Sequence, residues 1–376
     1  MQQLAGPVLV YRLTNSPFAL GLVAFMAAIP AAPLSLLAGP LIDRLPRRPL
    51  LIVTQLGLCL PPIALAVLVW TGRVQVWHVV VAELLRGMFL AVDQPAKQAA
   101  IVDMTGKEDV ASAIALWSSA NSITRVVGPA VAGVVIAWAG EGLCFLLNGL
   151  SYLAVVGALL AITFPASLPR ARRSSLAGSL RDGLKYVFQR KQRQLLILAG
   201  LSLVAAALVR PFQTLLPVFA LDLLKVGTTG MGFMTAAAGF GAVLGALGAA
   251  SLRSEKQQDL AWLASLVLPF VAAGFAFSHS FVLSCGLLVL MGGWEAALET
   301  AVNSLMLIKV EDEYRGRVVS LYTAAAMGAP RVGGLQAGWL AAVWSAPIAL
   351  GIGAVMYAIF SGTLLLVDRF GNAKSG

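Results

Sequence analysis

Long apolar runs separated by short polar segments are the feature that most constrains how this chain can fold. Each run is close to the roughly 20 residues that a helix needs to cross the hydrocarbon of a membrane. There are eleven of them, covering residues 18–38, 50–70, 76–93, 113–138, 143–164, 195–216, 230–250, 260–277, 281–308, 318–342 and 346–367. Only 12% of the 376 residues are charged, about half the usual share in a soluble domain. The sequence therefore predicts an all-α protein whose solvent is lipid.

The first eleven residues, MQQLAGPVLVY, look like the end of one more apolar run. They are too few to cross a membrane alone, and they lack the basic start and the cleavage site of a signal peptide. We therefore expect the chain to begin late in a first helix, and we number the complete runs from 2 to 12.

The basic residues indicate which side of the membrane each loop faces. Of the 27 Lys and Arg residues, 20 lie on one side, and only Arg12, Arg73 and Lys225 lie on the other. Because cytoplasmic loops carry the excess of positive charge, the richer side is predicted to be cytoplasmic. The formal charge of +10 then indicates anionic lipid headgroups, and not nucleic acid, as the partner. We expect a multi-pass protein of the cell inner membrane.

Residues 165–194 divide the chain into a bundle of residues 1–164 and a bundle of residues 195–376. The segment opens PASLPRARRSS and continues with a helical pattern in which five apolar residues share one face. They are Leu176, Leu180, Leu184, Val187 and Phe188. We expect an amphipathic helix on the cytoplasmic leaflet that joins the two bundles. A plain solvated linker is the alternative.

The two bundles look like copies of each other. At an offset of 205 residues, Glu108 aligns with Glu313 and Gly128 aligns with Gly333. The same offset holds across a loop and two helices. It predicts a parallel repeat of six helices, with a cavity where the halves meet.

Three segments resemble the major facilitator superfamily of transporters. The loop GPLIDRLPRRP at 39–49 is similar to its cytoplasmic signature, with Pro46 where the general pattern has Gly, and EDEYRGRVVSLY at 311–322 is the matching segment of the second half. The stretch from PAKQAAIVDMTGKEDVASAIAL through NSITRVVGPAVAG is similar to the branch of enterobactin exporters and macrolide-efflux proteins. The resemblance covers nearly the whole chain. It implies two six-helix bundles and export of a drug, a macrolide or a siderophore-like molecule.

The loop after the second helix carries a candidate cytoplasmic gate. Gly39 permits a tight exit from the helix, and Pro46 prevents its continuation. The motif also contains three basic residues that suit the anionic membrane surface, namely Arg44, Arg47 and Arg48. Asp43, an acid beside three arginines, is the unusual residue of the motif.

We expect Asp43 to contact the start of helix 11, where Arg317 and the positive helix end both stabilise a carboxylate. We expect Asp93, at the inner end of helix 4, to face Arg44 or Arg47. These contacts would favour the outward-open state. Neutralisation of Asp43 by its own neighbours in the loop is the alternative.

Helix 5 contains Gly128 and Pro129, followed by Ala132 and Gly133, a pattern that permits close helix contact and bends the axis. In the superfamily that this chain resembles, a Gly-Pro pattern in helix 5 is characteristic of exporters, so the resemblance implies export. Generic helix packing is the alternative. Helix 8 offers a counterpart in Gly239, Gly241, Gly245 and Gly248.

Ionisable side chains inside the apolar runs are the sharpest indication of function, because each is costly in lipid unless it is paired or wetted. They are Glu83, Arg86, Arg125, Arg210, Glu295, Glu299 and Arg331. Glu83 and Arg86 are three residues apart on one helix and can simply pair. Arg210 lies near the predicted outer end of helix 7 and can extend to the headgroups.

Glu295 and Glu299 lie one helical turn apart in helix 10 and are the candidate proton-coupling site. Two close carboxylates in a low-dielectric bundle repel each other, so we expect one of them to hold a proton near neutral pH. Approach of Arg125 or Arg331 would release that proton. A fixed ion pair between helices 10 and 11, or an acid that reaches inward to water, is the alternative.

The sequence carries no signature of an enzyme or of a resident cofactor. Both histidines, His78 and His279, fall in outer loops, and neither a nucleotide-binding loop nor a metal-ligand spacing is present. We therefore expect secondary transport by a monomer that binds a small molecule, with protons as the coupling ion. An importer, and a membrane sensor or scaffold that transports nothing, are the alternatives.

Overall fold

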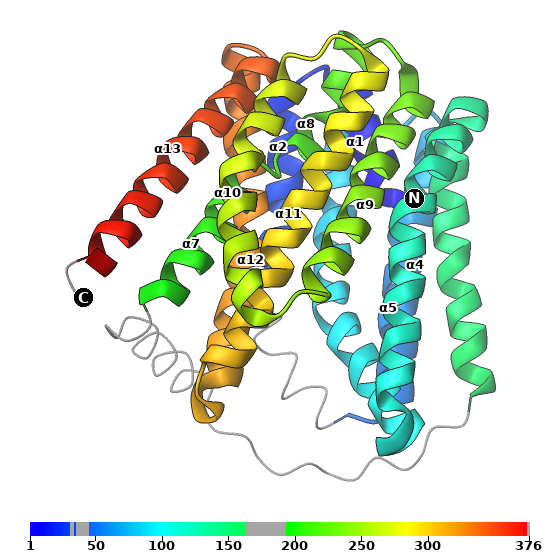
Figure 1. Cartoon of the computed structure of the whole chain (residues 1–376). Coiled ribbons are helices and arrows are strands. Elements are labelled where there is room, and N and C mark those ends of the chain that lie inside the picture. Colours follow the sequence, from blue (N-terminus) through cyan, green and yellow to red (C-terminus); the bar gives the residue numbers. More distant parts are fainter. Residues whose placement is uncertain (31–33, 35–44, 163–192, 374–376) are drawn as a thin grey trace. The chain divides into compact units, whose positions relative to one another are not determined.

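A computed structural model describes residues 1–30, 34, 45–162 and 193–373 of the chain (Figure 1). Every element of secondary structure in these described residues is a helix, which confirms the all-α prediction. The predicted linker at 165–194 lies outside them, except for its last two residues, which belong to helix α7 (Arg193–Leu208).

The chain divides into two compact units. Unit 1 comprises Met1–Arg173 and Gly227–Gly232, and unit 2 comprises Ser174–Val226 and Phe233–Gly376. Each unit has its own set of buried apolar side chains, from residues such as Leu9 in unit 1 to Leu201 in unit 2.

Unit 1 is built from four described helices, α1 (Gln2–Thr14), α2 (Pro17–Met26), α4 (Arg47–Trp70) and α5 (Val76–Ala161). The side chain of Ser16 accepts a hydrogen bond from the backbone N–H of Ala19 at 3.4 Å, which caps α2. Pro17 follows at the first helical position, where its missing N–H is tolerated. The predicted run 18–38 begins in α2, and most of its second half lies outside the described residues.

Helix α5 is 86 residues long. A straight helix of that size would extend about 130 Å, far more than the roughly 30 Å of hydrocarbon in a bilayer. The backbone of α5 changes direction instead: Gly140 has a φ of 78°, a left-handed conformation that glycine adopts at little cost. Figure 1 shows this cyan-to-teal segment folding back on itself. The predicted runs 76–93, 113–138 and 143–164 therefore share one helical element, the last of them as far as Ala161.

Unit 2 contains α7, introduced above, and seven further helical elements among the described residues. These are α8 (Phe212–Val218), the π-helix η2 (Phe219–Leu223), α9 (Gly227–Ala250), α10 (Ser254–Ala276), α11 (Phe281–Lys309), α12 (Asp312–Val343) and α13 (Ala346–Ala373), of which α9 begins in unit 1. Helix α7 packs against α11, α12 and α13. Side chains of α7 can therefore meet those of three other helices in unit 2.

Small residues let α9 and α11 approach closely. A Cβ added to Gly241 would lie 1.9 Å from the carbonyl oxygen of Val289, and one added to Gly245 would lie 1.9 Å from that of Gly293. No side chain fits at such a distance, so the contact between these two helices depends on glycine. A Cβ added to Gly248, one turn further along α9, would meet no atom within 4 Å.

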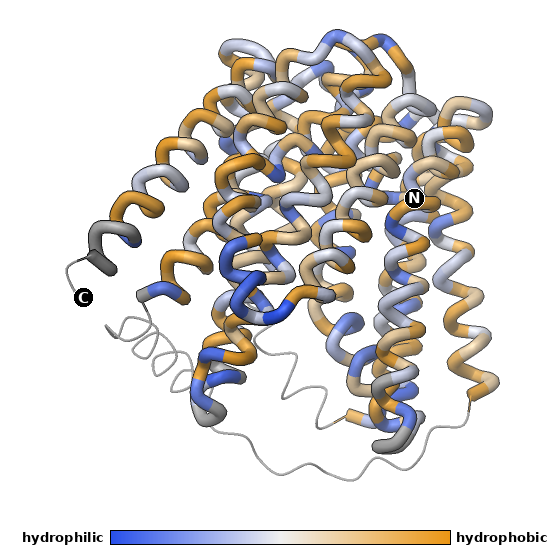
Figure 2. The backbone as a smooth tube through the Cα atoms, in the orientation of Figure 1, coloured by the Kyte–Doolittle hydropathy of each residue, from blue (hydrophilic) through white to orange (hydrophobic). Residues whose placement is uncertain are grey.

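Seven helical stretches in the described residues are long and apolar enough to cross a membrane. They are Arg47–Trp70, Ser112–Ala161, Gln194–Leu223, Gly227–Ala250, Ser254–Ala276, Phe281–Lys309 and Ala346–Asp368. Large apolar side chains such as Trp138 and Phe270 are 83% and 74% exposed. Figure 2 shows hydrophobic colour along the helices and hydrophilic colour where α9 passes into α10 and α11 passes into α12. An apolar surface of this extent requires lipid around it, so the chain is a multi-pass membrane protein.

We expect Gly241→Ala to destabilise the protein, because the new Cβ would push α9 away from the backbone of α11. Overpacking of a tight contact typically costs about 1–3 kcal/mol. Thermal unfolding of the detergent-purified protein measures the effect. Gly248→Ala is the matched control and should leave the unfolding midpoint unchanged, since its Cβ meets no atom within 4 Å. The same midpoint for both variants would contradict the described contact.

Candidate functional site

Arg210 lies in a break within a helical segment of membrane length. The segment Gln194–Leu223 is 30 residues long, and within it α7 ends at Leu208 and α8 begins at Phe212. Pro211, in the break, has no backbone N–H with which to continue the helical hydrogen bonds. The break therefore places Arg210 near the middle of the segment.

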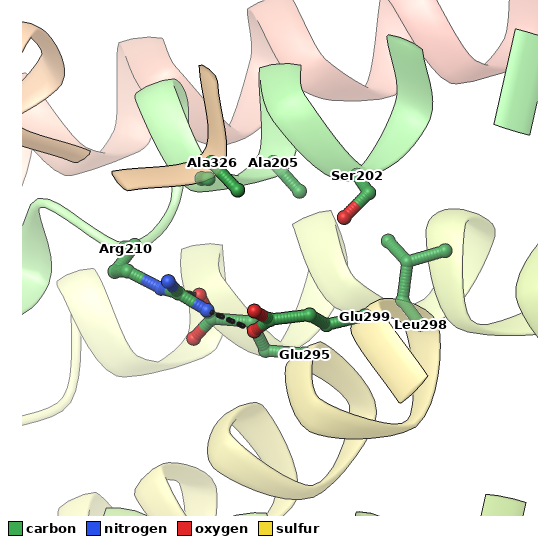
Figure 3. A pocket seen from close by; sticks show the side chains of 8 residues that line it. Ser202, Ala205, Arg210, Glu295, Leu298, Glu299 and Ala326 are labelled. Carbon is green, nitrogen blue, oxygen red and sulfur yellow. Dashed lines mark hydrogen bonds and ion pairs between the residues drawn. The ribbon is translucent and has the colours of Figure 1, made fainter. Parts of the chain in front are cut away.

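Helix α11 presents two carboxylates to this arginine. Glu295 and Glu299 are four residues apart and share one face of the helix. The Nε of Arg210 donates to Oε1 of Glu295, and its Nη2 donates to Oε2 of Glu299 at 2.7 Å. Figure 3 shows the guanidinium reaching across to both carboxylates. The three side chains form one ion cluster, here called the Arg210 triad.

A small pocket adjoins the Arg210 triad, with room for about one water molecule. Ser202 of α7 lines it, and the hydroxyl groups of Ser202 and Tyr322 are hydrogen-bonded at 2.7 Å. The remaining lining is apolar and consists of Ala205, Ala206, Leu298 and Ala326 (Figure 3). The triad is therefore in contact with a narrow, mainly apolar space that has a hydroxyl pair at its edge.

The members of the triad differ in exposure, and they comprise two carboxyl groups and one guanidinium. The side chains of Glu295, Arg210 and Glu299 are 9%, 24% and 39% exposed. Two ionised carboxylates and one guanidinium carry a net charge of about −1 at neutral pH. Such a charge inside a membrane protein is costly unless a proton, a cation or water offsets it. The arrangement is therefore suited to binding and releasing a positive charge.

The predicted depth of Arg210, near the outer end of helix 7, stays a prediction, but the side chain contacts Glu295 and Glu299 and is not extended toward headgroups. The predicted run ended at residue 216, whereas the helical segment continues to Leu223, so Arg210 falls near its middle and turns inward. Sequence reasoning expected Arg125 or Arg331 as the cation beside the two glutamates and missed Arg210. Pro211, the next residue, was the available signal, because proline often marks a helix break. The Nη1 of Arg331 donates to the carbonyl of Met327 at 2.5 Å.

Unit 1 holds a different buried polar cluster. The Nε of Arg86 donates to Oε2 of Glu83 at 2.8 Å, so these two residues pair along one helix as the simpler alternative predicted. Gln2 donates to Oε1 of Glu83 at 3.0 Å, and Asn148 donates to Gln2 at 3.2 Å. No pattern in the sequence pointed to Gln2 or Asn148. The charges of this cluster cancel.

Asp93 is fully buried in unit 1 and has three polar partners. Its Oδ2 lies 2.8 Å from the Nζ of Lys97. Its Oδ1 accepts hydrogen bonds from Thr54 at 2.8 Å and from Gln55 at 2.6 Å. Lys97, one helical turn away, supplies a positive charge. The predicted contact with Arg44 or Arg47 stays a prediction, because Arg44 lies outside the described residues.

The arginines at the start of α4 bind elsewhere in unit 1. The Nε of Arg47 lies 3.2 Å from Oδ2 of Asp103. The Nε of Arg48 donates to the carbonyl of Leu159 at 2.8 Å, and its Nη2 donates to that of Leu160. These carbonyls lie in the last turn of α5, where a cation is favourable. Both arginines therefore tie the start of α4 to α5.

The remaining gate residues lie outside the described part of the chain. Gly39, Asp43 and Arg44 are among the residues whose placement is not described, and the same holds for the side chain of Arg317. The predicted contact between Asp43 and Arg317 stays a prediction.

The glycine-proline motif lies within α5, in unit 1. A Cβ added to Gly133 would lie 2.6 Å from the carbonyl oxygen of Thr228 and 3.0 Å from the Cα of Gly232. Gly133 therefore permits a close backbone contact inside unit 1. At Gly128 the nearest atom, in Thr124, would be 3.9 Å away, so that glycine has room for a side chain.

Buried ionisable groups inside a helical membrane protein indicate a functional site. Comparison with known proteins defines the class. The chain belongs to the family described as transmembrane secretion effector, within the major facilitator superfamily, since the model of that family matches residues 1–373. This confirms the family resemblance read from the sequence.

Two curated relatives are siderophore transporters by name. The chain is 26% identical over 306 residues to a protein of Staphylococcus aureus named staphyloferrin A transporter, covering 80% of this chain and 76% of that protein. It is 25% identical over 376 residues to the enterobactin exporter EntS of Shigella boydii, covering 96% of this chain and 86% of that protein.

Solved structures show the same fold at low sequence identity. The nucleoside transporter NupG matches with a TM-score of 0.76 at 13% identity, over 98% of this chain and 95% of that one. A bacterial homologue of the human lysosomal transporter Spinster, in an inward-facing and occupied conformation, matches with a TM-score of 0.72 at 12% identity, over 98% and 92%. These similarities confirm the predicted fold of the major facilitator type.

We expect Arg210→Met to destabilise the protein strongly, because it leaves two carboxylates facing each other without their cation. Removing one partner of a buried ion group typically costs about 3–5 kcal/mol. The yield of monodisperse protein after detergent extraction and the unfolding midpoint measure the loss. Arg253→Met, at an exposed arginine before α10, is the control. Adding Glu295→Gln to Arg210→Met should recover part of the stability, and failure to recover any would contradict charge pairing as the role of Arg210.

Proposed function

We propose that this protein is a secondary active transporter that exports a small organic molecule in exchange for protons. The observation that carries the proposal is the Arg210 triad, in which one cation faces Glu295 and Glu299 near the middle of two membrane-length segments. A proton-coupled transporter needs a buried group that changes charge during its cycle. A cluster with one excess carboxylate next to a pocket meets that need.

Export is supported by the relatives and by the helix-5 motif of Gly128 and Pro129. One curated relative is named as an exporter of enterobactin and another as a transporter of staphyloferrin A. A siderophore-like molecule, a macrolide or a drug of similar size is therefore the substrate class that we propose. The superfamily also contains importers, so direction is the first property to test.

Alternating access is the proposed cycle. In this proposal the bundles of residues 1–164 and 195–376 exchange inward-open and outward-open arrangements around a central site, joined on the cytoplasmic side by residues 165–194. The contact of Asp43 with Arg317 would stabilise the outward-open arrangement. The proposed location is the inner membrane, and the proposed working form is a monomer.

Transport in everted membrane vesicles tests direction and coupling. When respiration acidifies the lumen, vesicles with the protein should accumulate its substrate severalfold over empty-vector vesicles, and a protonophore should abolish the difference. A panel of enterobactin, a macrolide and organic cations serves as the set of probes. Glu255→Gln, at an exposed carboxylate of α10, should transport like the parent protein. Gradient-driven accumulation in right-side-out vesicles would instead identify an importer.

Cysteine labelling tests the proposed orientation. Arg73→Cys should react with a membrane-impermeant maleimide added to intact spheroplasts, because its loop is predicted to face outward. Arg253→Cys, in a loop predicted to be cytoplasmic, should react only after the membrane is permeabilised. Both positions are exposed, whereas the native Cys59 and Cys144 are buried. The reverse labelling pattern would overturn the orientation.

A further inference from the structure

The two carboxylates of the Arg210 triad are not equivalent. The side chain of Glu295 is 9% exposed, and that of Glu299 is 39% exposed. Glu299 therefore reaches water or a ligand more readily than Glu295 does. Both carboxylates line the small pocket beside the triad (Figure 3), so their difference lies in their exposure.

The surroundings of Glu295 favour its ionised form. It accepts a hydrogen bond from the Nε of Arg210. This ion pair is largely shielded from water, which strengthens the attraction between its two charges. Glu295 thus has the features of a permanent counter-ion to Arg210.

The surroundings of Glu299 leave it open to exchange. Its Oε2 accepts the hydrogen bond from Nη2 of Arg210 at 2.7 Å, and no described residue donates to its Oε1. Tyr322, on α12, lies within electrostatic reach of Glu299 and Arg210, but its hydroxyl is already bonded to that of Ser202. Oε1 of Glu299 is therefore available to a group from outside the cluster.

Few other ionisable groups face Glu299. Arg210 reaches it from the break after α7, and Glu295 lies one turn away on α11. The segment of α9 in unit 2 carries no ionisable side chain. The ionisable residues of α10 stand near its first residue, beside the far end of α11, where Lys309 contacts Gln258. Arg210 is therefore the described cation in contact with Glu299.

We propose that Glu299 is an exchange site that holds either a proton or a cationic group of the substrate, while Glu295 remains ionised as the counter-ion of Arg210. Binding of the cationic group releases the proton: the neutral carboxylic acid becomes a carboxylate paired with the cation, and the proton passes to water. The total charge of the cluster plus its occupant is the same in both states. This inference rests on the proposed proton-coupled export.

The charge of the Arg210 triad determines whether a cationic or an anionic substrate could exchange with a proton. A cation and a proton compete for the same carboxylate, so each displaces the other, as exchange requires. An anion would have to bind Arg210, and it would bind best when Glu299 is protonated. Anion and proton would then bind together, which produces cotransport. The cluster therefore favours a substrate that presents an amine or another cationic group.

Paired probes of equal shape and opposite charge test the proposal. Tetraphenylphosphonium and tetraphenylborate are titrated into the detergent-purified full chain between acid and neutral pH. We expect the phosphonium Kd to fall by about tenfold for each unit by which the pH rises through the acid range, because one proton competes with one cation. Glu299→Gln should weaken phosphonium binding at neutral pH and remove its pH dependence. Glu255→Gln should behave like the parent protein.

Three outcomes would overturn the proposal. They are tighter binding of borate than of phosphonium by the parent protein, no phosphonium binding at all, and a pH dependence that survives in Glu299→Gln. Tighter phosphonium binding that depends on pH in the parent protein and not in this variant supports it.

Infrared difference spectroscopy tests the proton carrier without a ligand. Acidification of the parent protein should produce a carboxylic-acid C=O band that is absent from Glu299→Gln and present in Glu255→Gln. A band that persists in Glu299→Gln and disappears in Glu295→Gln would assign the proton to Glu295 and overturn the proposal. These readouts need no transport, so failure of the vesicle assay alone would overturn the proposed export and leave the assignment of the proton to Glu299 standing.

Discussion

A guanidinium held between two carboxylates, in a protein surrounded by lipid, is the interaction on which unit 2 depends. Neither the arginine nor the glutamates can be solvated by the hydrocarbon, so each requires the others in place. Arg210 extends from the break after α7 toward α11. The glycines of α9 allow close backbone contact between α9 and α11, which helps to hold α11 in place. The helix geometry around the triad is thus a condition for keeping these charges buried.

Two buried ion pairs of unit 1 differ from the Arg210 triad of unit 2, because each lies within a single helix. In unit 1, Glu83 pairs with Arg86 and Asp93 pairs with Lys97, each within one helical turn. Each pair is neutral, and its members belong to the same helix, so it persists wherever that helix moves. The Arg210 triad joins two helices and has two carboxyl groups for one guanidinium. A cluster of this kind responds both to helix movement and to the arrival of a positive charge.

The sequence predicted the class of fold because the apolar runs and the biased basic loops are local patterns. Glu295 and Glu299 were found for the same reason, since two acids four residues apart in an apolar run are visible without a structure. Their partner was not found, because Arg210 lies 85 residues from Glu295 and the contact depends on how α7 and α11 pack. The length of the run differed too: its end was predicted at residue 216, whereas the helical segment continues to Leu223.

The irregular backbone of unit 2 gathers around Arg210. Helix α7 stops just before it, Pro217 stands inside α8, and the π-helix η2 follows directly. Such features weaken the regular hydrogen bonds of a helix and are frequent at functional sites. Glu295 and Glu299, by contrast, lie within the uninterrupted helix α11. The arginine segment therefore has fewer regular helical hydrogen bonds than α11, whereas the two carboxylates are held at a fixed spacing by an uninterrupted helix.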